Sequence, residues 1–158
     1  MITFHKVLIL ALLAASVGSA QPTDPKADKE PFSISIVPMD NDLRTGAEVF
    51  VKVRIVNNSK NGTVSRGGFY AQGVDTAFQY DCRNAAGKYV NKEIFPVGSI
   101  GDAPPLGPGE SYEETVPVSR ACDLSHPGQY QIQISKRILG DPQHRVVKSN
   151  TVKITVIR

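Results

Sequence analysis

The chain has 158 residues with a formal net charge of +3, and 41% of its residues are hydrophobic. These values fit one globular domain and exclude a collagen, a coiled coil and a wholly disordered chain. Its 13 glycines and 11 prolines argue against a helical bundle, and 2 cysteines are too few for a disulfide-dense miniprotein or a four-cysteine zinc site. The basic residues are scattered among acidic ones, without the Lys/Arg block of a nucleic-acid-binding arm, so we expect no nucleic-acid partner.

Residues 1–20 have the three parts of a secretory signal peptide. A short basic start precedes an unbroken apolar run over residues 7–15, and Gly18 and Ala20 occupy the −3 and −1 positions of a cut before Gln21. The run is shorter than the ~20 apolar residues that span a bilayer, which favours cleavage over a retained anchor. We therefore expect a secreted or periplasmic protein without stable membrane insertion, and the sequence leaves periplasm and extracellular space open.

Residues 21–31 form a linker that contains prolines and charged residues but no aliphatic side chain larger than alanine. Such a segment cannot bury enough apolar surface to offset its conformational entropy. We expect it to be a flexible tether between the cut site and a folded domain at residues 32–158.

From Phe32 onward, apolar residues alternate with polar ones at a period of two, which predicts half-buried β-strands. Five segments carry this pattern most clearly, namely residues 32–36, 49–55, 78–82, 130–135 and 152–156. Weaker candidates lie at residues 68–72, 88–92, 94–97 and 112–118, and Pro117 demotes the last of these to a sheet edge or a bulge.

Turn-forming residues separate these segments, at residues 40–46, 57–62, 84–87, 104–109 and 126–128. The stretch at residues 84–87 fits a tight hairpin. Many short strands with turn signals between them predict an all-β sandwich or barrel. Half-buried alternation fits two antiparallel sheets that share a core better than a parallel sheet buried on both faces.

Asn57 and Asn61 each head an Asn-x-Ser/Thr triplet. In a secreted eukaryotic protein both would be candidates for an attached glycan, whereas asparagine, serine and glycine are also simply common in turns. The turn interpretation is preferred, and glycosylation at either residue stays open.

Cys82 and Cys122 are interpreted as one structural disulfide, because secreted domains with a lone pair of cysteines usually join them. Closing this loop would stabilise the fold by up to about 4 kcal/mol. The alternative is a redox or nucleophilic thiol. The chain has no Cys-x-x-Cys motif, however, and Cys82, on the apolar face of its strand, would be a poor nucleophile.

Three stretches resemble the later strands of immunoglobulin-like domains in bacterial secreted proteins: LGPGES at residues 106–111, VPVS at 116–119 and DLSHPGQYQI at 123–132. They are similar to the all-β region of deuterolysin-type metallopeptidases and, more loosely, to BsuPI-type proteinase inhibitor domains. The resemblance implies an immunoglobulin-like antiparallel β-sandwich of about seven to nine strands. It also implies a tyrosine corner of Asp123, Gly128 and Tyr130, in which the tyrosine hydroxyl bonds to nearby backbone. The zinc-binding H-E-x-x-H motif is missing, so peptidase activity is not implied.

His126 and His144 lie in turns, and no pair of potential ligands has the helical spacing of a zinc site, so we expect no catalytic, metal-binding or cofactor-binding residues. The hypothesis is an exported, non-enzymatic immunoglobulin-like module of unknown ligand. It would act as a monomer on an unidentified protein or envelope partner, through the loops at residues 57–68 and 98–108. The alternative is a secreted proteinase inhibitor that presents the proline-stiffened loop at 98–108 to a protease.

Export with cleavage predicts a mature N-terminus at Gln21. Edman degradation of protein recovered from the periplasm or medium of an expressing bacterium should therefore begin with QPTDP. An Ala20→Leu variant should retain the leader, because the −1 position requires a small residue. Exported protein that still starts at Met1 would contradict the signal-peptide prediction.

Overall fold

The computed structural model describes residues 30–40, 42–66, 70–71, 74–94 and 104–158. The predicted signal peptide, most of the linker and residues 98–103 of the second predicted loop lie outside these ranges. The described chain is built of β-strands with one 3-10 helix, η1 at Val118–Arg120. Its strands are β1 Phe32–Pro38, β2 Asp42–Arg44, β3 Phe50–Asn57, β4 Tyr70–Ala71, β5 Val74–Asp75, β6 Phe78–Asn84, β7 Ser111–Pro117, β8 Gly128–Arg137, β9 Val146–Lys148 and β10 Val152–Ile157. Within the described ranges no helix is long and apolar enough to cross a membrane.

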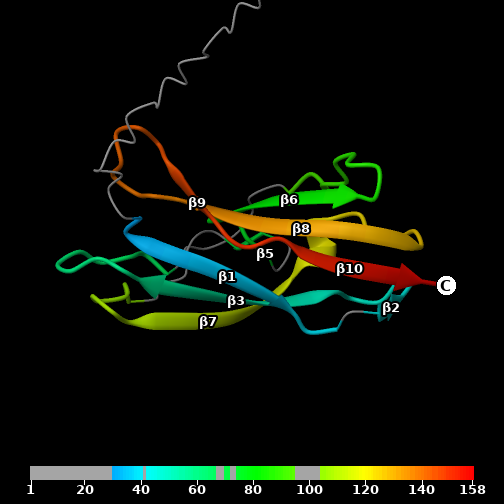
Figure 1. The fold of residues 1–158 in the computed structure, drawn as a ribbon, viewed down its shortest axis with the longest axis horizontal. Helices are drawn as coiled ribbons and strands as arrows, with labels where there is room; N and C mark the ends of the chain where they lie inside the picture. Colours follow the sequence, from blue (N-terminus) through cyan, green and yellow to red (C-terminus); the bar gives the residue numbers. More distant parts are fainter. Residues whose placement is uncertain (1–29, 41, 67–69, 72–73, 95–103) are drawn as a thin grey trace, which may run out of the picture.

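The strands form two facing layers (Figure 1). One sheet has the order β1-β3-β7 and is antiparallel throughout. The other has the order β2-β10-β8-β6, with β9 paired to β8, and its short strand β2 runs parallel to β10. The strands β4 and β5 form a separate hairpin. The chain is thus an all-β, immunoglobulin-like antiparallel β-sandwich, and the predicted fold class is confirmed.

The core of the sandwich follows the predicted alternation. In β3, the side chains of Val51, Val53 and Ile55 are at most 1% exposed, and those between them are not buried. In the opposite sheet, Ile132 and Ile134 of β8 are fully buried. Burial of an aliphatic side chain of this size contributes about 1.5–3 kcal/mol. The inward rows therefore fix the register, because a shift of one residue would turn them toward water.

A side-chain amide closes the free edge of β1. The Oδ1 atom of Asn150 accepts a hydrogen bond from the backbone N of Ile36 (2.8 Å), and its Nδ2 donates to the backbone O of Ile36 (2.9 Å). The amide thus bonds the outward-facing N–H and C=O of Ile36, which could otherwise pair with a strand of another chain. At the opposite edge of this sheet, β7 ends at Pro117, which has no N–H to offer. The edge position predicted from Pro117 is confirmed.

The structure corrects the sequence predictions mainly at short elements. The strand β2 lies inside the predicted turn at residues 40–46, and β9 matches no predicted strand. Three residues are too few to display an alternation, so such strands depend on the neighbour that pairs with them. With these elements the described chain has ten strands, against about seven to nine predicted.

The weaker strand candidates have mixed outcomes. Residues 88–92 contact β6 through the isolated bridge Arg83↔Tyr89 instead of forming a continuous strand. Of the candidates at 68–72 and 94–97, the structure describes β4 and Ile94 alone. The candidate at 112–118 corresponds to β7, except that its last residue begins η1.

Replacing Asn150 by alanine removes both hydrogen bonds to Ile36 and leaves the edge N–H and C=O of that residue unpaired. We expect the free energy of unfolding in urea to fall by about 1–3 kcal/mol. Asn61→Ala is the matched control, because Asn61 is exposed in the connection after β3 and its loss should cost less than about 0.5 kcal/mol. Equal effects of the two substitutions would contradict the role given to Asn150.

Candidate binding surface

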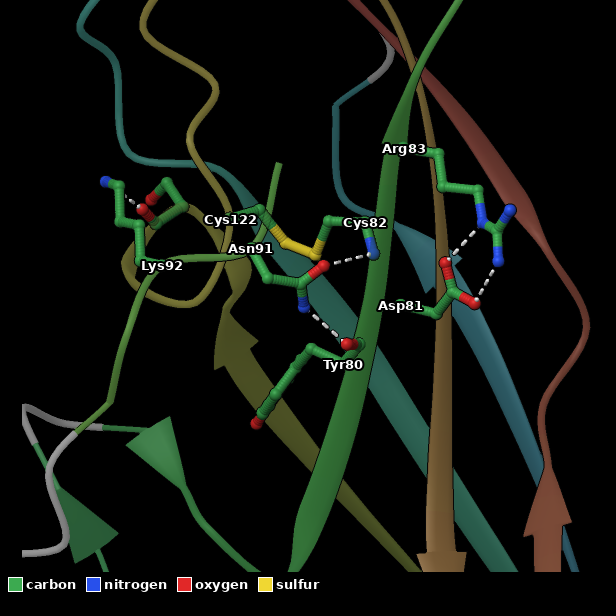
Figure 2. Close-up of a disulfide and its surroundings, with 8 residues drawn as sticks. Tyr80, Asp81, Cys82, Arg83, Asn91, Lys92 and Cys122 are labelled. Atoms are coloured by element: carbon green, nitrogen blue, oxygen red, sulfur yellow. Dashed lines mark hydrogen bonds and ion pairs between the residues drawn. A yellow bond between two sulfur atoms is a disulfide. The ribbon is translucent and has the colours of Figure 1, made fainter. Parts of the chain in front are cut away.

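A disulfide joins Cys82 of β6 to Cys122, which follows η1, and the two Cα atoms lie 5.8 Å apart (Figure 2). Both cysteines are fully buried. The Cα separation lies in the usual range for disulfides. Burial keeps both sulfur atoms away from reagents at the surface, as expected of a structural bond rather than a reactive thiol.

Residues 88–92 bond both to β6 and to the chain around Cys122. Val90 N donates to the backbone O of Cys82 (2.9 Å), and Val90 O accepts from the backbone N of Asp123 (2.6 Å). Farther along, Lys92 N donates to Ala121 O (2.8 Å). Residues 88–92 are therefore bonded to both pieces of chain that the disulfide connects, and we call them the clamped segment.

Asn91 of the clamped segment closes the edge of β6 as Asn150 closes that of β1. Its Oδ1 accepts from the backbone N of Cys82 (3.3 Å), and its Nδ2 donates to the backbone O of Tyr80 (Figure 2). A turn of the predicted type leads into the segment: Asn84 Oδ1 accepts from the backbone N of Lys88 (3.0 Å), and Gly87 has a φ of +76° that favours glycine. The hairpin predicted at residues 84–87 is confirmed.

The outward side of β6 and β8 is polar and hollowed. The residues that alternate with buried Cys82 and Ile132 point away from the core. Two adjoining hollows of about 350 and 380 Å³ lie there and share Asp81, Gln133 and Lys148 in their walls. Their lining also includes Gln79, Tyr80, Arg83, Tyr89, Gln131, Ser135, Val146 and Thr151. We call this surface the outer trough.

Arg83 organises one end of the outer trough. Its guanidinium binds the carboxylate of Asp81 through two contacts, from Nε to Oδ1 (2.8 Å) and from Nη2 to Oδ2 (3.1 Å) (Figure 2). It also stacks 4.1 Å from the ring centre of Tyr89 and donates to the tyrosine hydroxyl. The hydrogen bond to Asp81 raises the pKa of Arg83 above its ordinary value. Because the ion pair is more than one-third exposed, it orients these groups more than it stabilises the fold.

Tyr130, which was predicted to lie in a tyrosine corner, bonds to nearby backbone through its hydroxyl group. Tyr130 is buried, and its hydroxyl donates to the backbone O of His126 (2.7 Å). Asp123 does not contact the tyrosine; its Oδ1 accepts from Ser125 Oγ (2.6 Å) and from Ser125 N (3.2 Å), which lowers the pKa of the carboxyl group. Gly128 is the first residue of β8. Asp123 thus shapes the connection before β8, and Tyr130, inside β8, bonds back to that connection.

Asp123, Ser125 and His126 lie together but have the wrong order for a catalytic triad. Ser125 Oγ lies 2.6 Å from Asp123 Oδ1, to which it donates, and 3.0 Å from His126 Nδ1, so the serine lies between the acid and the histidine. In a serine hydrolase the histidine instead accepts the serine proton and is oriented by the aspartate. His144 lies apart, in a turn closed by its backbone bond to Asp141 O. Within the described ranges, no three His, Cys, Asp or Glu side chains gather as metal ligands.

The structure distinguishes Asn57 from Asn61. The side chain of Asn57 is buried: its Nδ2 donates to Gly62 O (2.8 Å) and Leu106 O (3.0 Å), and its Oδ1 accepts from Ser59. Asn61 is exposed. The amide nitrogen of Asn57 thus bonds its own loop to Leu106. The Asn-x-Ser/Thr pattern alone did not predict this structural role.

No protein-family model matches this chain, and no curated protein matches it. Among solved structures, the chain is similar to the crystal structure of the CARDB domain of the PF1109 protein from Pyrococcus furiosus, in complex with di-metal ions. The similarity covers 80% of this chain and 87% of that chain, with 14% sequence identity and a TM-score of 0.40. The immunoglobulin-like sandwich rests on the two sheets of this chain, and the finer resemblance to deuterolysin-type or BsuPI-type domains finds no support.

Removing the disulfide should loosen the clamped segment. A Cys82→Ala, Cys122→Ala double variant should lose up to about 4 kcal/mol of unfolding free energy, because the bond closes a loop with a sequence separation of 40 residues. Mass spectrometry of the native protein without reductant should give a mass lower by two hydrogens than that of the dithiol form. Two cysteines that alkylate in the native protein would contradict the bond.

Removing the hydroxyl of Tyr130 should destabilise the fold without changing its core volume. Tyr130→Phe leaves the backbone O of His126 without its donor, and we expect a loss of about 1 kcal/mol in the free energy of unfolding. Tyr89→Phe provides the matched control, since Tyr89 is 58% exposed and its hydroxyl bond lies at the surface. A larger loss for Tyr89→Phe would contradict the assigned roles.

Proposed function

We propose that this protein is an exported, non-enzymatic binding module that holds a polar ligand in the outer trough. The supporting observation is the trough itself: two joined hollows whose walls are donor and acceptor side chains projecting from β6, β8 and β9. Binding groups on paired strands are held with their geometry largely fixed before a ligand arrives, which lowers the entropy cost of association.

Export is supported by the disulfide. Such bonds form and persist in oxidising compartments and are rare in the cytosol. The signal peptide expected at residues 1–20 supports the same location, secreted or periplasmic. An envelope or extracellular ligand is therefore the kind that this module would meet.

The proposal moves the expected binding surface from loops to a sheet face. The buried side chain of Asn57 holds the start of the first predicted loop in place through its hydrogen bonds to Gly62 and Leu106. This part of the loop therefore has a structural role. Residues 98–103 of the second predicted loop lie outside the described residues, so a role for that loop stays a prediction.

Site-directed photo-crosslinking tests the proposal. A benzophenone amino acid is placed at Gln131 in the trough, at Lys60 in the loop after β3, or at Ser35 on the outward side of β1. The three proteins are then irradiated in envelope extract from the source organism. We expect one specific adduct from the Gln131 position and none from Ser35.

Two results would contradict the proposal. An adduct from the Lys60 position alone would return binding to the loop. The absence of any adduct from Gln131 would deny that the trough contacts a ligand. Circular dichroism of each labelled protein checks beforehand that the sandwich is intact.

A further inference from the structure

The charges in the outer trough and on the neighbouring strand β10 are unevenly distributed. In β6, β9 and β10 the outward-facing side chains include three cations, Arg83, Lys148 and Lys153, and one acid, Asp81. Arg83 and Asp81 compensate each other. No described carboxylate lies within ion-pair distance of Lys148 or Lys153. The surface therefore has a surplus of positive charge, which favours an anionic ligand.

The register places these cations around a row of neutral polar groups. Gln131 lies between Arg83 of β6 and Lys153 of β10, and Ser135 is paired to Lys148 of β9. By contrast, the cations Lys52 and Arg54 on the outward side of β3 lie 4.0 and 3.8 Å from the carboxylate of Glu113. The outward face of the other sheet thus offers cations that are already paired.

The remaining walls of the trough distinguish between classes of anionic ligand. Among its described lining, Val146 is the single aliphatic residue, and Tyr80 is partly buried against the core. A protein partner usually needs an apolar anchor in a desolvated pocket, which this lining does not provide. Single-stranded nucleic acids need aromatic platforms for successive bases, and Tyr89 is the one large exposed ring at this surface.

A polyhydroxylated ligand fits the same walls well. Amides and hydroxyls, such as those of Gln79, Gln131 and Ser135, both donate to and accept from sugar hydroxyls. The exposed ring of Tyr89 offers an apolar surface with a polar tip, suited to the C–H face of a sugar. Cations beside these groups match carboxylates attached to the sugar.

We propose that the outer trough binds an acidic polysaccharide. Lys148 in its wall and Lys153 beside Gln131 pair with uronate carboxylates, while the glutamine amides and the Tyr89 ring hold the sugar units. This inference rests on the proposed function, whose site it shares, and adds the chemical class of the ligand. It requires no covalent step.

Isothermal titration calorimetry with the folded, disulfide-bonded protein tests it. The probes are oligogalacturonate, an uncharged galactan of similar length and single-stranded DNA. We expect binding of oligogalacturonate and none of galactan. A Lys148→Gln, Lys153→Gln variant should bind oligogalacturonate about tenfold more weakly, because two solvent-exposed ion pairs are lost. Lys52→Gln, on the opposite sheet, should leave the affinity unchanged.

Three results would overturn the inference. The protein could bind galactan as tightly as oligogalacturonate, it could bind DNA more tightly than oligogalacturonate, or the Lys148→Gln, Lys153→Gln variant could keep the affinity for oligogalacturonate unchanged. Failure to bind oligogalacturonate at all would also overturn it. Each of these results leaves the proposed function standing if the Gln131 crosslinker still captures a ligand. If that crosslinker captures nothing, the proposed function itself fails.

Discussion

The bond between Cys82 and Cys122 is the constraint on which the functional end of this sandwich depends. It connects β6 to the chain after η1, and residues 88–92 are hydrogen-bonded to both. That segment is too irregular to form a strand, so hydrogen bonds on both sides and the covalent link must hold it in place. Its residue Tyr89 then meets Arg83 at the wall of the outer trough. The fold and the proposed site are thus joined through one covalent connection.

The closure of sheet edges by asparagine side chains is the second organising feature. Asn91 covers the edge of β6 and Asn150 that of β1, in each case by bonding both a backbone N–H and a C=O. Unpaired edges invite the addition of strands from other chains. Closing them fits the expected monomer and favours partners that bind to a sheet face rather than along an edge.

The sequence predicted the strands and turns that can be recognised from their own residues. Alternation located β1, β3, β6, β8 and β10, since each is long enough to show which side chains face the core. The turn at residues 84–87 followed from its own side chains. The amide closures could not be predicted, because Asn150 meets Ile36 across 114 positions of chain and an asparagine in a connection looks like any turn residue.

The outer trough was missed for a related reason. The sequence shows that polar residues alternate with apolar ones in each of two strands, with Asp81 and Arg83 in one and Gln131 and Gln133 in the other. What the sequence does not contain is the neighbour relation, in which β6 lies beside β8 and β9 brings Lys148 to the same face. Polar strand faces are usually only solvated surface, so the signal becomes informative once three strands are seen to share it.

The most direct test of the account is an amide NMR titration of the isotope-labelled protein with oligogalacturonate. The shifted resonances are expected to cluster in β6, β8, β9 and β10 and in the clamped segment, with those of β1 and β7 unchanged. Shifts confined to β1 and β7, or to the loop after β3, would contradict it.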